Sequence, residues 1–301
     1  MNNKTRRFVA VDVLLILLMV LPLVAGMMLK ILFAPPSEGI SITGAQVYFT
    51  IPMPLQDLPI SEAQVNSALV VLTILGICLY LTHGVRAGVK TRRQLLAEWV
   101  VEKLDDMVKE SMGNYFSAFP PFIAAILALS ALSSLLSLLG LFAPTSDVNI
   151  VAGWAILVFI LITYYKLKGG FLNYAKSFTE PIVVMLPLNI LGEVATPVSM
   201  AFRHYGNVLS GSVIAVLIAS ALAGLSNLVL GWLPGVLGDF PLLRIGIPAV
   251  LSMYFDIFSG CMQAYIFAML TMLNISGAFP QDLYEERKRR KLEKKAQKAK
   301  A

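Results

Sequence analysis

Hydrophobic residues in this chain gather into a few long runs instead of alternating with polar residues. Scanned with a window of ~19 residues, the chain has apolar segments at 8–33, 65–84, 119–142, 150–166, 181–232 and 245–276. Runs of this length, without the short alternating segments of a β-barrel, predict membrane-spanning helices. We therefore expect an all-α polytopic membrane protein with about six apolar spans.

Two of these spans are longer than a perpendicular crossing requires. As one straight helix, the ~50 residues of the fifth span would measure ~75 Å, more than twice the hydrocarbon thickness. This span must tilt steeply, kink or fold back, and Pro187 and Pro197 are its natural kink points. Gly206 and Gly211 would let another backbone approach. With the long sixth span, this predicts two strongly tilted helices that present a broad face in the membrane.

A different pattern occupies residues 94–113, where apolar residues recur at roughly helical spacing with charged residues between them. This pattern predicts an amphipathic helix that lies on the cytoplasmic face of the membrane. A solvated helix packed against a partner would have the same pattern, and the sequence leaves both interpretations open.

Composition supports a membrane protein, because 57% of residues are hydrophobic, only 14% are charged and the mean hydropathy is +0.75. The net charge of +6 does not indicate a nucleic-acid partner, since the basic residues are segregated along the chain. They lie at 4–7, 86–109, 166–176 and 287–300. If each span crosses once, all these clusters share one side.

The opposite side receives mostly acidic residues. They are Glu38, Asp57, Glu62, Asp147 and Asp239, with Lys30 and Arg244 as the basic residues near the membrane there. By the positive-inside rule, both termini are expected in the cytoplasm. A signal peptide is the alternative for the first span, but the apolar run exceeds the ~7 to 15 residues of a signal core and lacks a clear Ala-x-Ala site.

Arg203 lies in the apolar stretch 197–211, with no acidic residue within nine positions on either side. A permanent cation at membrane depth costs at least ~2.5 to 3.5 kcal/mol, so such a residue suggests a functional site. The alternatives are an arginine that snorkels to the interface or one that is paired inside the bundle.

Other polar residues lie at helical offsets from each other. Ser199, Arg203 and Asn207 are four apart and share one side of a helix. On the last span, Asp256 shares a face with Gln263 by the same arithmetic. Asp256 is a second charge at membrane depth, and spacing leaves two roles open: a static salt bridge with Arg203, or a proton relay.

These residues belong to segments that resemble a known family. The segment from Leu186 to Gly211 resembles the central signature of subunit a of F-type ATP synthases. Segments 143–170 and 262–271 resemble the fourth-helix region and the last helix of the same family. The likeness covers roughly residues 65 to 277 in the right order, so the first span is an addition relative to shorter bacterial members.

The resemblance implies that the chain is a stator subunit that moves a proton or sodium ion through two offset half-channels. Arg203 would face a rotating ring of c subunits, each with one essential carboxylate. At ~4 Å and an effective dielectric of ~20, this attraction is worth ~4 kcal/mol, or about three pKa units. Arginine suits the role because it keeps its proton when desolvated.

The same resemblance implies the partners and the location. The partners are the c ring, the b-subunit peripheral stalk, other synthase subunits and membrane lipid, and the location is the bacterial plasma membrane. The sequence contains no nucleotide-binding loop, so ATP chemistry is expected on other subunits and this chain is not expected to be an enzyme. We expect no cofactor and no metal site.

Several family roles carry over to single positions. Those associated with the outer half-channel, or with helix packing around the arginine, fall on Thr145, Asp147, Asn149, Asn207 and Gln263. The acidic residue near the cytoplasmic half-channel corresponds to Glu193.

The chain departs from the family pattern at three positions. Ser212 replaces a frequent glutamate, Asp256 replaces histidine or glutamate, and His204 replaces the usual leucine. We hypothesise that Asp256 alone carries the titratable role in the outer channel. For His204, a packed or wetted position at the channel lip is favoured over a second relay.

These arguments divide the chain into three parts. Residues 1–63 form an extra transmembrane span and external loop, 64–280 the subunit a membrane domain, and 281–301 a basic cytoplasmic tail attracted to anionic lipid. The competing function is a secondary transporter in which Arg203 binds a substrate carboxylate and Asp256 a cation. We find no internal repeat to support it.

Overall fold

The computed structural model describes most of the chain. Described are residues 3–33, 44–54, 56–85, 91–179, 182–230, 246, 250–251, 253–282, 284–285 and 289. Of the residues discussed above, Glu38, Asp239 and Arg244 lie outside the described residues, as does most of the expected basic tail.

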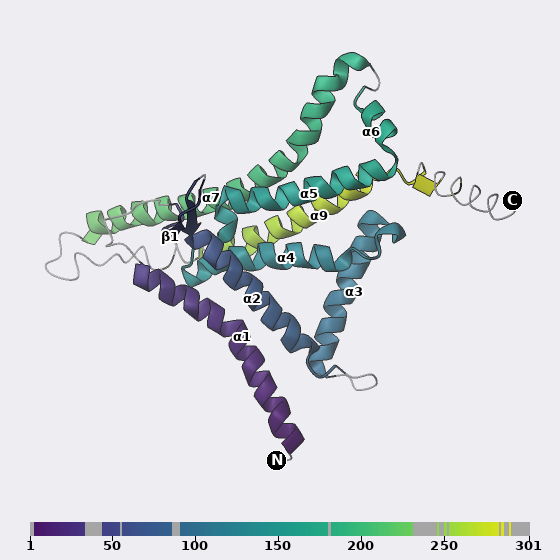
Figure 1. The fold of residues 1–301 in the computed structure, drawn as a ribbon. Coiled ribbons are helices and arrows are strands. Elements are labelled where there is room, and N and C mark those ends of the chain that lie inside the picture. Colours follow the sequence, from purple (N-terminus) through teal and green to yellow (C-terminus); the bar gives the residue numbers. More distant parts are fainter. Residues whose placement is uncertain are drawn as a thin grey trace.

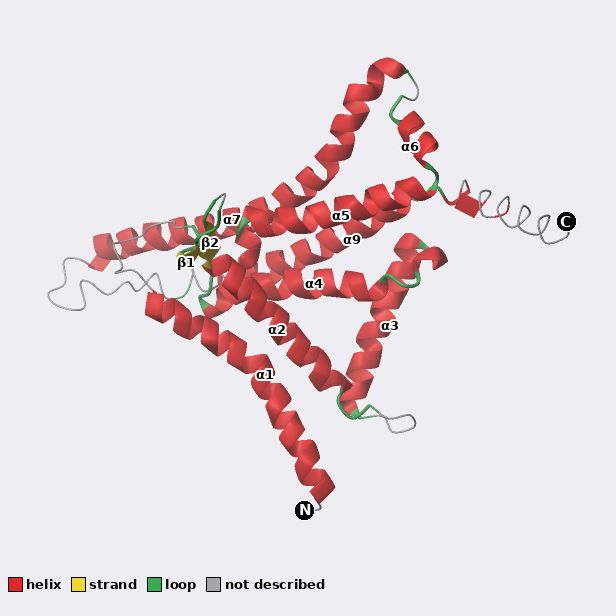
Figure 2. Cartoon of the chain, in the orientation of Figure 1, coloured by secondary structure: helices red, strands yellow, loops and turns green. Residues whose placement is uncertain are grey.

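Helices dominate the described chain (Figure 2). The helices of more than one turn are α1 (Asn3–Phe33), α2 (Glu62–Thr82), α3 (Arg92–Met112), α4 (Pro120–Leu135), α5 (Val148–Lys168), α6 (Phe171–Ser177), α7 (Leu186–Leu230), the π-helix η7 (Met253–Ser259) and α9 (Gly260–Ala278). Short 3-10 turns are η1 (Asn114–Phe116), η2 (Leu136–Leu139), η3 (Pro144–Ser146) and η4 (Val183–Met185). Six of the described helical segments are long and apolar enough to cross a membrane, which confirms the predicted all-α polytopic class.

A small β-hairpin is the element that the all-α prediction missed. β1 (Val47–Ile51) pairs antiparallel with β2 (Leu58–Ser61), with Thr50 opposite Pro59. It lies in the connection between the first two apolar spans, where backbone groups outside the hydrocarbon can be solvated, so an open sheet edge is permitted there.

The helices α2, α4, α5 and α9 lie side by side, with α1 against α2 and α7 against α5 (Figure 1). We call the end with β1, β2, η2 and η3 the hairpin end, and the end where α5 and α9 finish the tail end. The core between α3, α4, α5 and α9 is made of fully buried side chains, among them Val108, Ile123, Val158, Met272 and Ile275.

The long fifth span is one continuous helix. α7 has 45 residues, about 68 Å at 1.5 Å per residue, and it bends along its course instead of folding back (Figure 1). Pro187 stands in its first turn, where proline starts a helix, and Pro197 is inside it. Of the two glycines, Gly211 has the ring of Phe255 3.2 Å from its Cβ position, whereas no neighbouring element among the described residues comes within 4 Å of the Cβ position at Gly206.

The last span contains an irregularity that the sequence pattern did not predict. Residues Met253–Ser259 form the π-helix η7, and the α-helix α9 begins at Gly260. Asp256 therefore lies on a wider helical turn than the α-helical arithmetic assumed. The glycine after this segment permits close packing, because its Cβ position is 2.7 Å from Cβ of Ser134 on α4.

The amphipathic segment expected at 94–113 is α3. Near its end, Val108 and Met112 are buried against the core, whereas Trp99 and Val101 nearer its start are exposed. One half of the helix thus packs on the bundle and the other half presents apolar side chains outward. This arrangement fits a membrane-surface helix and a partner-bound helix equally.

Candidate functional site

Arg203 lies on the open side of α7. Its side chain is exposed, as is Ser199 one turn earlier, and among the described residues it has no hydrogen-bond or ion-pair partner. The static salt bridge with Asp256, one of the two roles left open, is absent from the structure, which describes both residues. Arg203 is also far from either end of α7, so it is poorly placed to snorkel.

The side chain of the neighbouring His204 is buried inside the helix bundle. It is 1% exposed, and its Nε2 lies 3.2 Å from the hydroxyl of Ser130 on α4. The rings of Trp154 on α5 and Phe267 on α9 meet it edge-on, with centroids 6.2 and 5.6 Å away. His204 therefore fastens α7 to three other helices, which fixes the side of α7 on which Arg203 emerges.

Asn207 lies one turn after Arg203 and is half-buried. Its amide donates a 2.8 Å hydrogen bond to the hydroxyl of Ser259 in η7. The two residues line a narrow crevice of about 10 Å³, which also has Ser134, Ser212 and Asp256 in its wall. A space of this size and polarity is close to the minimum for one water molecule.

A much larger cavity, of about 750 Å³, opens from this crevice toward the hairpin end. Asp256 and Ser212 line both spaces, and α7 contributes the stretch from Tyr205 to Val216. We call this space the hairpin-end cavity. Because it shares four wall residues with the crevice, which are Ser137, Val208, Ser212 and Asp256, it leads from the surface toward the segment just after Arg203.

Three expected site residues lie at the start of α5 or in the turn η3 just before it. Asp147 and Asn149 line the hairpin-end cavity, and Asp147 also caps the helix by accepting a 2.9 Å hydrogen bond from the backbone N–H of Asn149. Thr145 is fully buried, with its hydroxyl 3.4 Å from that of Ser134. Gln263 stands apart: it is half-buried on α9 and lines neither of these two spaces.

Glu193 lies toward the other end, ten residues before Arg203. Only 9% of its side chain is exposed, and Lys166 Nζ is 3.1 Å from its Oε1. The hydroxyl of Tyr174 donates a 2.9 Å hydrogen bond to the same oxygen. Burial, and then this bond to a carboxylate, raise the pKa of Tyr174 to about 12, so it remains a donor at physiological pH.

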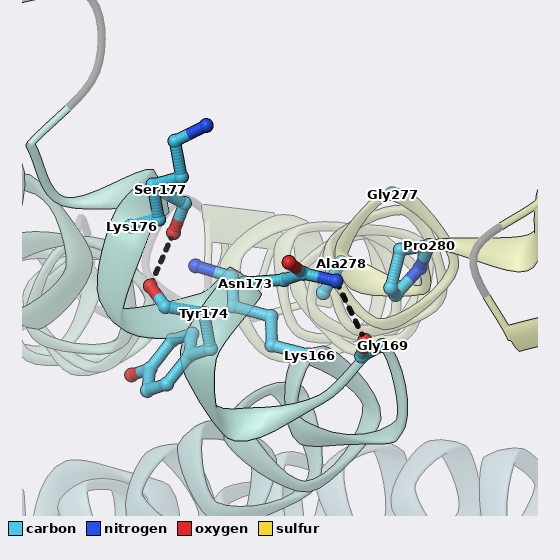
Figure 3. A pocket seen from close by; sticks show the side chains of 9 residues that line it. All are labelled: Lys166, Gly169, Asn173, Tyr174, Lys176, Ser177, Gly277, Ala278 and Pro280. Carbon is cyan, nitrogen blue, oxygen red and sulfur yellow. Dashed lines mark hydrogen bonds between the residues drawn. The ribbon is translucent and has the colours of Figure 1, made fainter. Parts of the chain in front are cut away.

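Two adjoining cavities surround this cluster at the tail end. One, of about 220 Å³, is lined by Glu193, Thr196 and Asn274. The other, of about 360 Å³, shares the side chain of Lys166 with it and is open at the surface, where Asn173 and Tyr174 form its wall (Figure 3). Asn173 is itself held by a 3.1 Å bond to the carbonyl of Gly169. We call the two together the tail-end cavities.

Sequence reasoning missed several polar partners of these residues. Lys166 was used only for topology, and Tyr174, Ser130 and Ser259 were not selected. Hydroxyl side chains within apolar runs were the sequence signal that could have marked the serines and the tyrosine as candidates. Each contact joins helices that are distant in sequence, so residue spacing could not show which side chains pair.

Comparison with known proteins shows the family to which the chain belongs. The model of the family described as ATP synthase A chain matches residues 65–276. The chain belongs to this family. The match leaves α1, both hairpin strands and the first residues of α2 outside it.

Individual relatives agree with the subunit a family. The chain is 27% identical over 276 residues to the sodium ion specific ATP synthase subunit a of Propionigenium modestum, covering 81% of this chain and 88% of the relative. It is 30% identical over 216 residues to the subunit a of Acidothermus cellulolyticus, covering 69% and 73%. With that of Desulforamulus reducens, identity is 33% over 197 residues, covering 64% and 69%.

Membership confirms the resemblance seen in the sequence. The chain is a non-catalytic integral membrane subunit of the Fo sector of an F-type ATP synthase, and other subunits of that synthase are its partners. The secondary-transporter alternative is excluded by the same finding.

Proposed function

We propose that this subunit transfers protons or sodium ions through two half-channels that meet at Arg203, against a rotating ring of c subunits. The observation that carries the proposal is the placement of the cavities along α7. The tail-end cavities reach α7 at Glu193 and Thr196, and the hairpin-end cavity reaches it from Tyr205 onward. Arg203 lies between these two stretches of the helix.

The hairpin-end cavity is the outer half-channel in this proposal. An ion that enters it meets Asp256, the titratable group shared by the cavity and the narrow crevice. The crevice then leads to Asn207, one turn from Arg203. Asp256 is the ion relay on this path, with Ser212 beside it, while Thr145, Asp147 and Asn149 shape the wall; Gln263 supports the helix packing around the arginine.

The tail-end cavities are the cytoplasmic half-channel. Glu193 is its acidic group, and Lys166 compensates the charge of that carboxylate inside the bundle. Arg203, which keeps its charge at membrane depth, prevents an ion from crossing directly between the two paths. An ion must therefore ride the c ring.

The open side of α7 fits a moving partner. Phe202 beside Arg203 is 60% exposed, and Val198 and Ser199, about one turn earlier, are exposed as well. In lipid, an exposed arginine on such a face would lack any counter-charge. The carboxylates of the ring supply it in turn, which explains why the chain provides no static partner among its described residues.

Orientation follows from the charges. Lys166 and Lys168 end α5 at the tail end, so the positive-inside rule places this end, and both termini, in the cytoplasm of a bacterium. The b-subunit stalk and lipid are the remaining partners. Residues 1–63 then form the added span and external loop, 64–280 the ion-transfer domain, and 281–301 the basic cytoplasmic tail.

The central experiment replaces Arg203. In the assembled ATP synthase in membrane vesicles, Arg203→Ala is expected to abolish both ATP synthesis and ATP-driven ion pumping. Arg92→Ala, which removes an exposed charge on α3, is the matched control and should retain both. Coupled synthesis that persists with Arg203→Ala would refute the mechanism.

The ring partner is tested by cross-linking. A photoreactive residue at Ser199, on the exposed face one turn before Arg203, is expected to capture a c subunit. The same residue at Leu14, exposed on α1, serves as the control and should capture lipid or other chains. Equal capture of c subunits at both positions would contradict the proposed face.

A further inference from the structure

The N-terminal helix α1 is held at both ends by charged side chains. Near its start, the Asp12 carboxylate binds Arg93 on α3 with two bonds of 2.8 and 2.7 Å. Near its end, the Lys30 ammonium bonds the carbonyl of Gly140 and lies 3.8 Å from Glu62 Oε1. The two contacts are about 27 Å apart along the helix, close to the hydrocarbon thickness.

Between these ends, α1 packs closely on α2. A Cβ at Gly76 would lie 3.0 Å from the backbone nitrogen of Met19, and one at Gly26 would lie 3.0 Å from a methyl of Leu69. Such backbone approach is typical of helix pairs in membranes. Although α1 lies outside the family match, it is therefore an integral part of this bundle.

Lys30 also reaches the ion path. Its side chain is 41% exposed and lines the hairpin-end cavity, whose other charged wall groups among the described residues are Asp147 and Asp256. Glu62 lies behind Lys30 with only 4% of its side chain exposed. The lysine is thus the cationic wall group that the added helix contributes to the cavity.

Glu62 joins this pair to the turn between η2 and η3. Its Oε1 accepts a 3.3 Å hydrogen bond from the backbone N–H of Phe142, and Asn66 donates a 2.9 Å bond to the carbonyl of the same residue. With the bond from Lys30 to Gly140, three side chains hold this turn, which is itself part of the cavity wall.

We propose that α1 is a working part of the outer half-channel, in which the Lys30–Glu62 pair holds the wall and keeps the cavity mouth electrically balanced. This inference rests on the proposed function of the hairpin-end cavity. Lys30 and Glu62 are positioning residues: they act on the potential and shape of the mouth, and the ion binds elsewhere. Each member cancels the charge that the other would present to an approaching cation.

If the charges of Lys30 and Glu62 cancel each other, replacing either residue alone should shift the half-saturating ion concentration, and the two shifts should be in opposite directions. Lys30→Met leaves the Glu62 carboxylate uncompensated and attracts cations, so the outer ion concentration for half-maximal ATP synthesis should fall. Glu62→Gln, which keeps the acceptor for Phe142, leaves Lys30 unopposed, so that concentration should rise. At about 10 to 15 Å and an effective dielectric of ~20, one unit charge changes this concentration roughly sixfold to 17-fold.

The experiment uses purified ATP synthase in proteoliposomes, with the transported ion varied in the lumen at a fixed membrane potential. The half-saturating concentration does not depend on how much enzyme assembles. Lys30→Met/Glu62→Gln should return it to the parent value, and high inert salt should shrink both single shifts. If Lys30→Met does not assemble, two other variants test the inference. The half-saturating ion concentration should rise with Glu62→Gln and should stay at the parent value with Lys30→Arg.

Asp12→Asn is the matched control, since it removes the carboxylate charge from the contact with Arg93 at the far end of α1, away from the cavity. A purely structural role for α1 would make Asp12→Asn act like Lys30→Met, and both single replacements at the mouth would then impair synthesis in the same direction. Either result, or no shift at all, would overturn the inference. Transport that survives Arg203→Ala would instead overturn the proposed function itself.

Discussion

Replacing His204 with leucine removes the hydrogen bond that joins α7 to α4 while keeping most of the buried volume. His204 is 1% exposed and its partner Ser130 is 0% exposed, so the serine hydroxyl loses its side-chain partner. A buried polar group left unpaired costs ~1 to 3 kcal/mol. We expect a destabilisation in this range for His204→Leu.

A second replacement, at Ser130, separates the contribution of the hydrogen bond to this destabilisation from that of packing. Ser130→Ala alone should also destabilise, because it leaves the His204 Nε2 without its partner. When both partners become apolar, neither unpaired group remains, so His204→Leu/Ser130→Ala should be less destabilised than the sum of the single changes. Hydrogen bonds between membrane helices average ~0.6 kcal/mol and reach ~1.7, which bounds the expected coupling.

The assay is the midpoint temperature at which the subunit is lost from detergent-solubilised ATP synthase, followed by native gel electrophoresis. ATP synthesis is measured in parallel at a temperature where all variants are assembled. A packed histidine predicts that the double variant retains synthesis. If the double variant is stable but inactive, His204 relays ions and the packing interpretation is wrong; if it is as unstable as the summed singles, the hydrogen bond is not the cause.

Two further predictions concern the ion path and the helix packing. Asp256→Asn should reduce ion-driven ATP synthesis ~100-fold or more, the range for loss of a proton-transfer group. Asp57→Asn in the hairpin connection is the control, and unimpaired synthesis with Asp256→Asn would exclude Asp256 as the relay. Gly76→Val should detach α1 from α2 and lower the yield of assembled subunit, because a Cβ there lies 3.0 Å from the α1 backbone. Gly153→Ala is the control and should assemble normally, because nothing described lies within 4 Å of its Cβ position. Equal yields of the two variants would mean that the close approach of α1 and α2 does not stabilise the subunit.

The apolar spans were predictable because hydrocarbon thickness imposes a length on any crossing helix. Hydropathy located five of the six described spans to within three residues at each end, whereas the last, expected from 245, is described from Met253. An isolated charge within an apolar run was enough to make Arg203 a functional candidate. The β-hairpin and η7 were not predictable in this way. Both depend on local backbone hydrogen bonding in segments whose composition does not differ from that of loops or α-helices.

The polar contacts that hold the site residues in place could not be predicted from the sequence either. Glu193 and Lys166 are 27 positions apart, and Asp12 and Arg93 are 81 apart, so neither pair lies at a helical offset. Lys30 lay on the expected outer side without an assigned role, since only the packing of α1 on α2 brings it to the cavity wall. Tertiary placement, and not residue type, supplies these pairings.

The one-sided packing of α7 is what the proposed rotary function requires. Its inner side is fixed by static contacts, His204 to Ser130 and Asn207 to Ser259. Its outer side must not be fixed, because a carboxylate held permanently within ~4 Å of Arg203 would be worth ~4 kcal/mol. A ring carboxylate would then have to displace it at a cost of about a thousandfold in binding. Under the proposed function, the absence of an Arg203–Asp256 bond between two described residues is therefore a requirement of turnover, and it leaves Asp256 available in the cavity for the proposed ion exchange.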